Sequence, residues 1–226
     1  MQIIEIYRSI QGESSFAGMP CTFVRLAGCN LRCDWCDSEY TFAGGKKMSS
    51  AEIEAEVKKL SPGGLVEITG GEPMLQEKEL VPLMERLLGL GYELLLESSG
   101  ERPLEHVPNA VHKIVDVKCP DSGEGGSFRM ENLPFLGKQD EVKFVLASRQ
   151  DYDFARRFTR EHDLEQRVGG VIFSPAFRKD AAGARDVSNC ALDPRDLADW
   201  IVADGLNVRL GLQIHKFIWA PETKGV

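Results

Sequence analysis

Short apolar segments alternate with amphipathic segments of helical periodicity along most of this 226-residue chain, and this alternation restricts its fold more than any other feature. Such alternation is typical of a parallel sheet with crossover helices. Strands are expected at Ile3–Tyr7, Cys21–Leu26, Leu65–Thr69, Tyr92–Glu97, Lys113–Val117, Glu141–Leu146, Gly170–Ser174 and Asn207–Gln213. Helices are expected from the Ser49–Glu52 capping box to Leu60, and at Glu77–Leu90, Tyr152–His162 and Pro194–Asp204.

The alternation is incomplete, because prolines interrupt the segment from Ser98 to Lys113 too often for a good helix. The sequence therefore predicts an α/β fold, a partial (incomplete) TIM-like barrel of mostly parallel strands with crossover helices. No repeat or linker divides residues 1–226, so one domain is expected. In such sheets, ligands bind at the carboxyl ends of the strands. Polar motifs follow four of the predicted strands at that edge: Thr69–Glu72, Glu97–Ser99, Asp116–Lys118 and Ser174.

Composition excludes several classes of protein. With 27 Lys and Arg against 35 Asp and Glu, the formal charge is −8, which disfavours a nucleic-acid partner. No apolar run approaches the roughly 20 residues that span a bilayer, so no membrane association is expected. The first residues do not resemble a signal peptide, and we expect a cytoplasmic location.

Three of the six cysteines, Cys29, Cys33 and Cys36, lie within eight residues. Three thiolates on one short loop suit three corners of a 4Fe–4S cluster, and they leave one iron open to chelate a substrate. A structural zinc site is the alternative, because Cys119 or a histidine could supply the fourth ligand that zinc normally requires. The other cysteines are scattered along the chain and need no metal.

The CxxxCxxC spacing, with Trp35 before its last cysteine, resembles the signature of the radical S-adenosylmethionine superfamily. The run Thr69–Pro73 resembles the GGEP motif of the same superfamily, in which it holds the methionine amino group. The resemblance implies that S-adenosylmethionine binds the open iron through its amino and carboxyl groups. One electron from the reduced cluster would then cleave the sulfonium to give a 5′-deoxyadenosyl radical.

Further segments resemble the 7-carboxy-7-deazaguanine synthase family, and the resemblance runs from Ile10 to the end of the chain. They are Ser9–Glu13, Phe23–Cys29, Cys36–Ser38, Asp116–Lys118 and Gln213–Trp219. The resemblance implies an enzyme of queuosine and deazapurine biosynthesis that contracts the ring of 6-carboxy-5,6,7,8-tetrahydropterin, giving 7-carboxy-7-deazaguanine and ammonia. It also implies regeneration of S-adenosylmethionine, a requirement for Mg²⁺, and a homodimer.

The same resemblance assigns residues to each ligand. Substrate contacts are expected from Ile10, Gln11, Gly12, Glu13, Arg25, Thr69 and His215. Contacts with S-adenosylmethionine are expected from Trp35, Cys36, Asp37, Gly71, Glu72, Ser98, Val115, Asp116, Val117 and Ser174. Arg25 suits a substrate carboxylate because its guanidinium offers a bidentate fork. Ser38 stands where the family has a Mg²⁺ ligand, and one hydroxyl suffices only if substrate oxygens and water complete the octahedron.

Ordinary structural roles remain open for these residues: a surface ion pair for Arg25, a hairpin turn for Gln11 to Glu13, and a loop cap for Ser38. No additional cysteine-rich region is present, so the electron donor is expected to be a separate flavodoxin- or ferredoxin-like protein. Two other classes also remain open, a glycyl-radical activase and a non-enzymatic iron–sulfur or zinc sensor.

Overall fold

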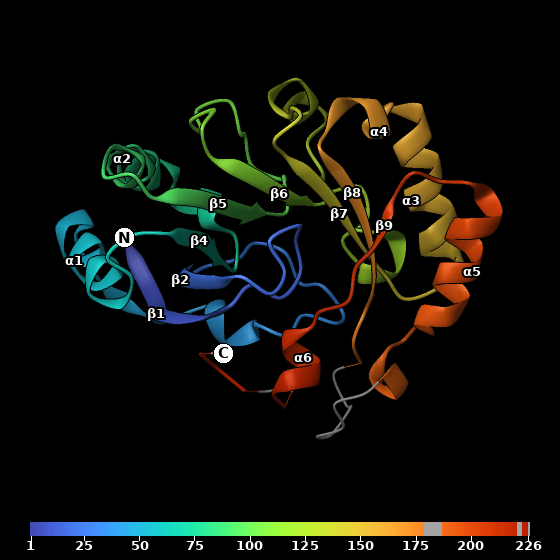
Figure 1. The fold of residues 1–226 in the computed structure, drawn as a ribbon, viewed down its shortest axis with the longest axis horizontal. Helices are drawn as coiled ribbons and strands as arrows, with labels where there is room; N and C mark the ends of the chain where they lie inside the picture. Colours follow the sequence, from blue (N-terminus) through green and yellow to red (C-terminus); the bar gives the residue numbers. More distant parts are fainter. Residues whose placement is uncertain (179–186, 221–222, 226) are drawn as a thin grey trace.

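One curved sheet of nine strands organises the computed structural model, which describes residues 1–178, 187–220 and 223–225 (Figure 1). The strands are β1 Gln2–Ile10, β2 Pro20–Leu26, β3 Lys46–Lys47, β4 Leu65–Gly70, β5 Glu93–Ser98, β6 His112–Asp116, β7 Glu141–Leu146, β8 Gly170–Pro175 and β9 Arg209–Leu210. Their order is β3-β1-β2-β4-β5-β6-β7-β8-β9. Pairing is parallel from β2 to β9, and β1 is antiparallel to both β2 and β3.

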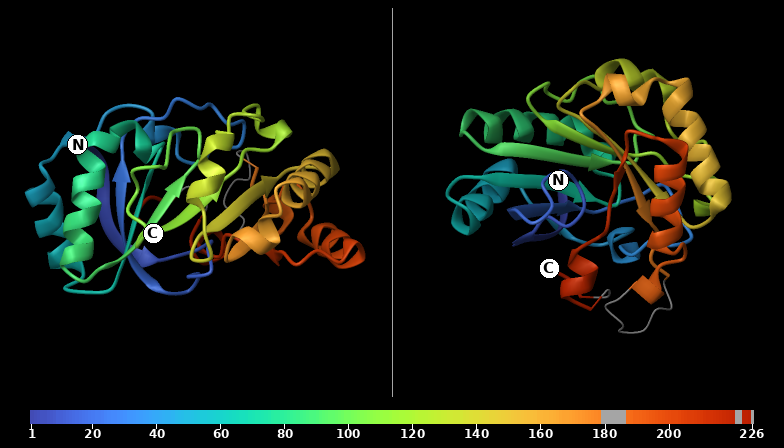
Figure 2. Two further views of the ribbon diagram at one scale, coloured as in Figure 1. Left: turned by 90° about the horizontal axis from the view of Figure 1, so that it is seen from above. Right: turned by 45° about the vertical axis from the view of Figure 1, so that its right-hand side comes forward.

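Five helices cover the convex side of this sheet: α1 Ser50–Leu60, α2 Glu77–Gly89, α3 Arg149–Glu161, α4 Leu164–Arg167 and α5 Pro194–Asp204. A sixth helix, α6 His215–Ile218, lies away from that side. Figures 1 and 2 show α1 and α2 over one end of the arc, α3 to α5 over the other, and α6 at the open side. Because β3 and β9 end the sheet without pairing to each other, the predicted partial barrel is confirmed. In the described ranges, no helix is long and apolar enough to cross a membrane.

Side-chain alternation along the strands gives the sheet two different faces. On β2, Val24 and Leu26 are completely buried in the large apolar cluster beneath the helices, whereas Phe23 belongs to a small cluster inside the arc. Burial of one such aliphatic side chain contributes roughly 1.5–3 kcal/mol, so the helix-covered face supplies most of the apolar stabilisation. The concave face is left free to carry polar side chains.

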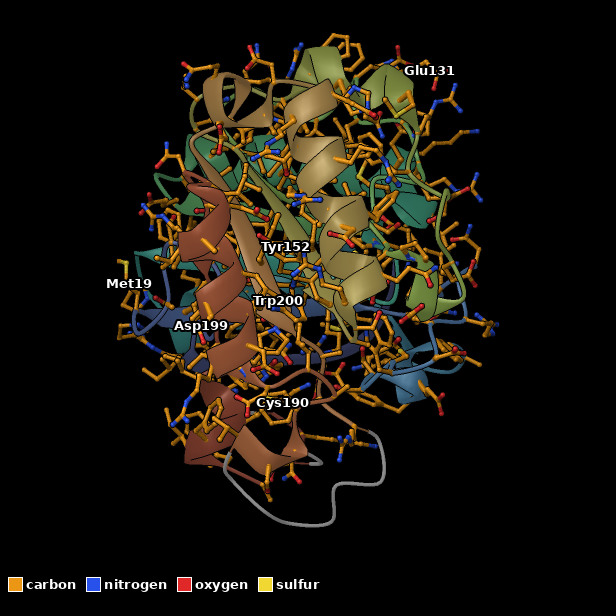
Figure 3. All side chains as sticks on the ribbon, turned by 90° about the vertical axis from the view of Figure 1, so that its right-hand side faces the viewer. Met19, Glu131, Tyr152, Cys190, Asp199 and Trp200 are labelled. Atoms are coloured by element: carbon orange, nitrogen blue, oxygen red, sulfur yellow. The ribbon has the colours of Figure 1, made fainter. Side chains whose placement is uncertain are left out.

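A capping box and a pair of aromatic side chains stabilise the helices on the sheet. The predicted capping box is present, since Ser49 accepts a hydrogen bond from the Glu52 amide and the Glu52 carboxylate accepts one from the Ser49 amide. Tyr152 and Trp200 lie between α3 and α5 (Figure 3), and their rings pack edge to face at 5.2 Å. The Tyr152 hydroxyl donates to the Trp200 carbonyl at 2.8 Å, which ties the two helices together.

The predicted strand Asn207–Gln213 is wrong for most of its length. Only Arg209 and Leu210 pair with β8, and the chain then leaves the sheet so that His215 begins α6. Ile214 donates its amide to the Gly12 carbonyl at 3.0 Å, so the β1–β2 loop draws the segment away from the sheet. The predicted absence of a helix between Ser98 and Lys113 is confirmed, because only turns connect β5 to β6.

Candidate active site

A cavity opens on the concave face at the carboxyl ends of the parallel strands, where the polar motifs were expected to meet. Most of the predicted site residues line it: Ile10, Gln11, Gly12, Glu13, Arg25, Cys29, Cys33, Trp35, Cys36, Asp37, Ser38, Thr69, Gly71, Ser98, Asp116 and His215. The cavity has a cysteine end, formed by the loop after β2, and a polar end, formed by the β1–β2 loop, α6 and inward-facing strand residues.

Main-chain hydrogen bonds shape the loop that carries the three cysteines. Gly28, with a φ of +97°, donates its amide to the Thr41 carbonyl at 2.7 Å. Its own carbonyl accepts from the Glu72 amide at 2.8 Å, which joins the cysteine loop to the Gly70–Pro73 turn. Within the loop, the Cys36 amide donates to the Cys33 carbonyl at 3.1 Å. The two motifs that the sequence placed 40 residues apart are therefore one structural unit.

The donor set of this loop fits an iron–sulfur cluster better than zinc. Cys29, Cys33 and Cys36 are each half-buried and all three line the cavity. Among the residues that the structure describes, no three His, Cys, Asp or Glu side chains converge on a point where one metal ion could bind. Thiolates of a 4Fe–4S cluster bind different irons and need not converge, whereas four zinc ligands must. Cys119 is completely buried in the apolar core, so it is not available as a fourth zinc ligand.

Glu72 lies behind the cavity wall, where its carboxylate binds neighbouring protein groups. It is completely buried, and its two carboxylate oxygens accept hydrogen bonds from the hydroxyls of Ser98 at 2.9 Å and Ser99 at 2.6 Å. The amides of Ser99 and Met74 also donate to it. Glu72 therefore fixes Ser98 at the cavity wall, and its own contact with S-adenosylmethionine stays a prediction.

Three other residues predicted to bind S-adenosylmethionine, Val115, Val117 and Ser174, are also absent from the cavity wall. Val115 and Val117 belong to the core beneath the helices, because the strand alternation turns Asp116 inward and its two neighbours outward. Their side chains cannot reach a ligand in the cavity, which leaves only their main chain for the predicted contact. Ser174 is buried at 3% exposure, and its predicted contact is likewise untested.

Asp116 offers an open acceptor at the cysteine end. Its Oδ2 accepts a hydrogen bond from the Lys118 ammonium at 2.7 Å, while its Oδ1 is buried without a hydrogen-bond partner. A buried unpaired carboxylate oxygen is costly, and a donor on a bound ligand would remove that cost. This acceptor fits a ligand such as S-adenosylmethionine, which carries hydroxyl and amino donors.

The β1–β2 loop forms one wall of the polar end. Its residues Gln11 to Glu13 make the turn between the two strands and also line the cavity. The Gln11 side chain accepts from the amide of Glu13 at 2.8 Å, and its Nε2 donates to Glu67 Oε2 at 3.0 Å. His215 packs so closely on Gly12 that an added Cβ would lie 2.1 Å from its Nδ1. The side-chain Nε2 of Gln213 donates to Glu13 Oε1 at 2.8 Å, so the segment leading into α6 completes this wall.

Arg25 reaches the cavity with part of its hydrogen-bonding capacity already used. Its Nε donates to Glu5 Oε1 at 2.9 Å and its Nη2 donates to the Tyr7 hydroxyl at 2.8 Å. A guanidinium has five N–H donors, so the outer edge remains available for a carboxylate in the cavity. Arg25 therefore does form an ion pair, but at the cavity wall and not on the outer surface as the alternative had it, and the pair with Glu5 orients the side chain.

Sequence reasoning missed two cavity residues at the polar end, Glu67 and Lys143. Each interrupts an apolar strand at an inward position, and that alternation was the signal that could have identified them. Burial, followed by the charge of Glu97, raises the pKa of Glu67 to about 8. Burial alone would also raise the pKa of Glu13, but Lys143, then His215 and Lys216, lower it to about 2.

Comparison with known proteins first defines the class. Residues 24–118 match the family model of the radical SAM superfamily. The fold is similar to the crystal structure of QueE from Escherichia coli, with a TM-score of 0.70 and 23% identity over 94% of this chain and 93% of that one. It is also similar to Streptococcus suis SuiB bound to S-adenosylmethionine, with a TM-score of 0.55 and 13% identity over 88% of this chain and 48% of that one.

Closer relatives then define the family. A 7-carboxy-7-deazaguanine synthase of Koribacter versatilis is 71% identical over the full length of both chains. One of Chlorobaculum tepidum is 39% identical over 100% of this chain and 97% of that protein. This chain belongs to the 7-carboxy-7-deazaguanine synthase family within the radical S-adenosylmethionine superfamily.

Proposed function

We propose that this chain converts 6-carboxy-5,6,7,8-tetrahydropterin to 7-carboxy-7-deazaguanine with loss of ammonia, in queuosine and deazapurine biosynthesis. One observation carries the proposal: a single cavity joins the three-cysteine loop to a polar end of amides, carboxylates and a guanidinium. A small anionic heterocycle with N–H donors suits that end. A glycyl-radical activase must seat a protein loop instead, and the family relationship supports the small-molecule substrate.

The chain's residues divide the work between the two ends. The cluster on Cys29, Cys33 and Cys36, when bound and reduced, supplies the electron that cleaves S-adenosylmethionine. Gly71, Ser98 and Asp116 line the cysteine end and hold the cofactor there. Gln11, Glu13, Thr69 and His215 line the polar end and orient the pterin. Holding both reactants in one cavity fixes their relative orientation, which lowers the barrier to reaction between them.

The test is an anaerobic assay of the reconstituted protein with the carboxypterin, S-adenosylmethionine and dithionite. We expect 7-carboxy-7-deazaguanine and ammonia, and about four iron and four sulfide per chain. Cleavage of S-adenosylmethionine with no deazaguanine would support a different radical enzyme, and a chain that binds zinc but no iron would support the sensor.

Arg25→Ala is expected to weaken substrate binding while the iron content stays unchanged. Loss of a buried charged hydrogen bond costs roughly 2–5 kcal/mol, and the upper part of that range is not expected because the side chain is 17% exposed. The readouts are the Michaelis constant for the carboxypterin and iron per chain. Arg86→Ala is the matched control, since Arg86 pairs with Glu54 on the outer helices at 54% exposure. Equal kinetics in both variants would refute the assignment of Arg25.

We also propose that Mg²⁺ binds at Ser38. The Ser38 hydroxyl lines the cavity and donates to Asp37 Oδ1 at 3.2 Å, so two protein oxygens lie together there. Mg²⁺ prefers six oxygens and usually keeps several waters, so the substrate must supply further ligands. The donor set fits a metal that positions the substrate.

Removal of Mg²⁺ is accordingly expected to lower turnover without changing iron content, and calorimetry should detect tight Mg²⁺ binding only with substrate present. Ser38→Ala should reduce turnover in the same way, whereas Ser38→Thr keeps the hydroxyl and should be tolerated. Equally tight binding of Mg²⁺ with and without substrate would contradict this site.

Several wider expectations belong to the same proposal. The electron donor is a flavodoxin- or ferredoxin-like protein, and the enzyme is a cytoplasmic homodimer of single-domain chains. For the dimer we choose as candidate interface the end of the sheet where Val202, on α5, and Leu210, on the edge strand β9, are exposed apolar side chains. Sedimentation analysis of the wild type and of Leu210→Asp tests this expectation.

A further inference from the structure

Lys143, on β7, is a buried cation surrounded by three carboxylates from three different segments. Its Nζ lies 2.6 Å from Glu13 Oε2, forms an ion pair with Glu97 Oε1, and lies 4.0 Å from Asp116 Oδ2. The lysine side chain is only 3% exposed, yet it belongs to the cavity wall. It therefore stands where the polar end of the cavity meets Asp116 of the cysteine end.

A second buried lysine nearby shows what a purely structural pair looks like in this fold. Lys113 on β6 is 2% exposed and lies 3.2 Å from Asp140 Oδ1, which is completely buried. This pair does not line the cavity. One carboxylate compensates Lys113, whereas Lys143 pairs with both Glu13 and Glu97, in addition to the more distant Asp116 that Lys118 already compensates. A surplus of buried negative charge is unfavourable unless another ligand uses it.

The charges around Lys143 decide which carboxyl groups at the polar end are ionised. Burial by itself would lower the pKa of Lys143, but Glu13, Glu97 and Asp116 hold it well above its ordinary value. Glu13 faces Lys143, His215 and Lys216, and is ionised at neutral pH. Glu67 accepts a hydrogen bond from Gln11, and burial, followed by the charge of Glu97, raises its pKa to about 8.

We propose that Lys143 is a positioning residue for the reaction, holding the side chains of Glu13 and Glu97 as acceptors for the N–H donors of the bound heterocycle. The inference rests on the proposed function and extends it to a residue outside the family resemblance. An aminopyrimidinone ring presents several N–H donors along one edge, and charged acceptors bind such donors about twice as strongly as neutral ones. Lys143 acts on the substrate through these carboxylates.

Lys143→Met is expected to raise the Michaelis constant for the carboxypterin by about 10–100-fold, by analogy with residues that orient the ligands of a metal ion. Iron content and substrate-free cleavage of S-adenosylmethionine should be retained. The pH profile should change as well. Without Lys143, burial raises the pKa of Glu13, so kcat/KM of the variant should fall as the pH is lowered from 8 to 6 more steeply than in the wild type.

Three further variants separate positioning from stability. Lys143→Arg keeps the charge and should restore the wild-type pH profile, and Glu13→Gln combined with Lys143→Met should remove the new acidic limb. Lys113→Met should lower the melting temperature while the Michaelis constant and pH profile stay unchanged. A wild-type profile in Lys143→Met overturns the inference, as does loss of iron and of cofactor cleavage in both Lys143 variants. If the wild type itself makes no deazaguanine, the proposed function fails first.

Discussion

Replacing Cys29, Cys33 or Cys36 by Ala is expected to abolish both cluster binding and cleavage of S-adenosylmethionine. Each cysteine supplies one of only three protein ligands on the loop, and no convergent group of metal ligands exists in the described part of the chain to replace them. The measurements are iron and sulfide per chain after anaerobic reconstitution, and 5′-deoxyadenosine formed with dithionite. Cys21→Ala and Cys190→Ala are the matched controls, because both thiols are buried away from the cavity wall. Full cleavage activity in any one of the three loop variants would refute the cluster assignment.

Gly71→Ala is expected to have an effect of similar size through the backbone. An added Cβ would lie 2.3 Å from the Gly28 carbonyl oxygen and 2.6 Å from the Cys29 Cβ, and neither atom can rotate away. The methyl group must therefore push the cysteine loop away from the Gly70–Pro73 turn, at a cost of at least about 1–3 kcal/mol. The displacement acts directly on Cys29, so the cluster should be lost or become unable to cleave the cofactor.

Gly89→Ala provides the control for this substitution. A Cβ at Gly89, the last residue of α2, would meet no atom within 4 Å, and alanine favours the helix by roughly 1 kcal/mol. That variant should keep full activity and gain slightly in melting temperature. Normal iron content together with normal cofactor cleavage in Gly71→Ala would show that the loop tolerates the displacement, contrary to our expectation.

Most of the sheet could be predicted because its strands are short apolar runs with breakers at each end. β4 lies between the Pro62–Gly64 turn and the Gly70–Gly71 turn, and the structure keeps those limits. Prediction failed after Asp204, where the alternating residues Val208, Leu210 and Leu212 resemble a strand. Tertiary contacts with Gly12 and Glu13 override that local preference, and no local pattern could reveal them.

The site was predictable to the extent that its residues lie in contiguous motifs. Cys29 to Ser38 and Thr69 to Glu72 were identified because their spacing is local in the sequence. Lys143 and Glu67 were missed because each stands alone within an apolar strand. The groups that either side chain contacts depend on which strands are its neighbours in the sheet. Only the order β4-β5-β6-β7 brings Glu67, Glu97, Asp116 and Lys143 onto one face.

The most direct test of the central claim uses fewer molecules of S-adenosylmethionine than of carboxypterin substrate. The anaerobic, dithionite-reduced protein is incubated with excess carboxypterin and Mg²⁺, and 7-carboxy-7-deazaguanine and 5′-deoxyadenosine are both quantified. If the radical is returned to the cofactor in each turnover, the deazaguanine formed will exceed the S-adenosylmethionine supplied, and little 5′-deoxyadenosine will accumulate. Formation of 5′-deoxyadenosine in step with consumption of S-adenosylmethionine, with no deazaguanine, would contradict the account.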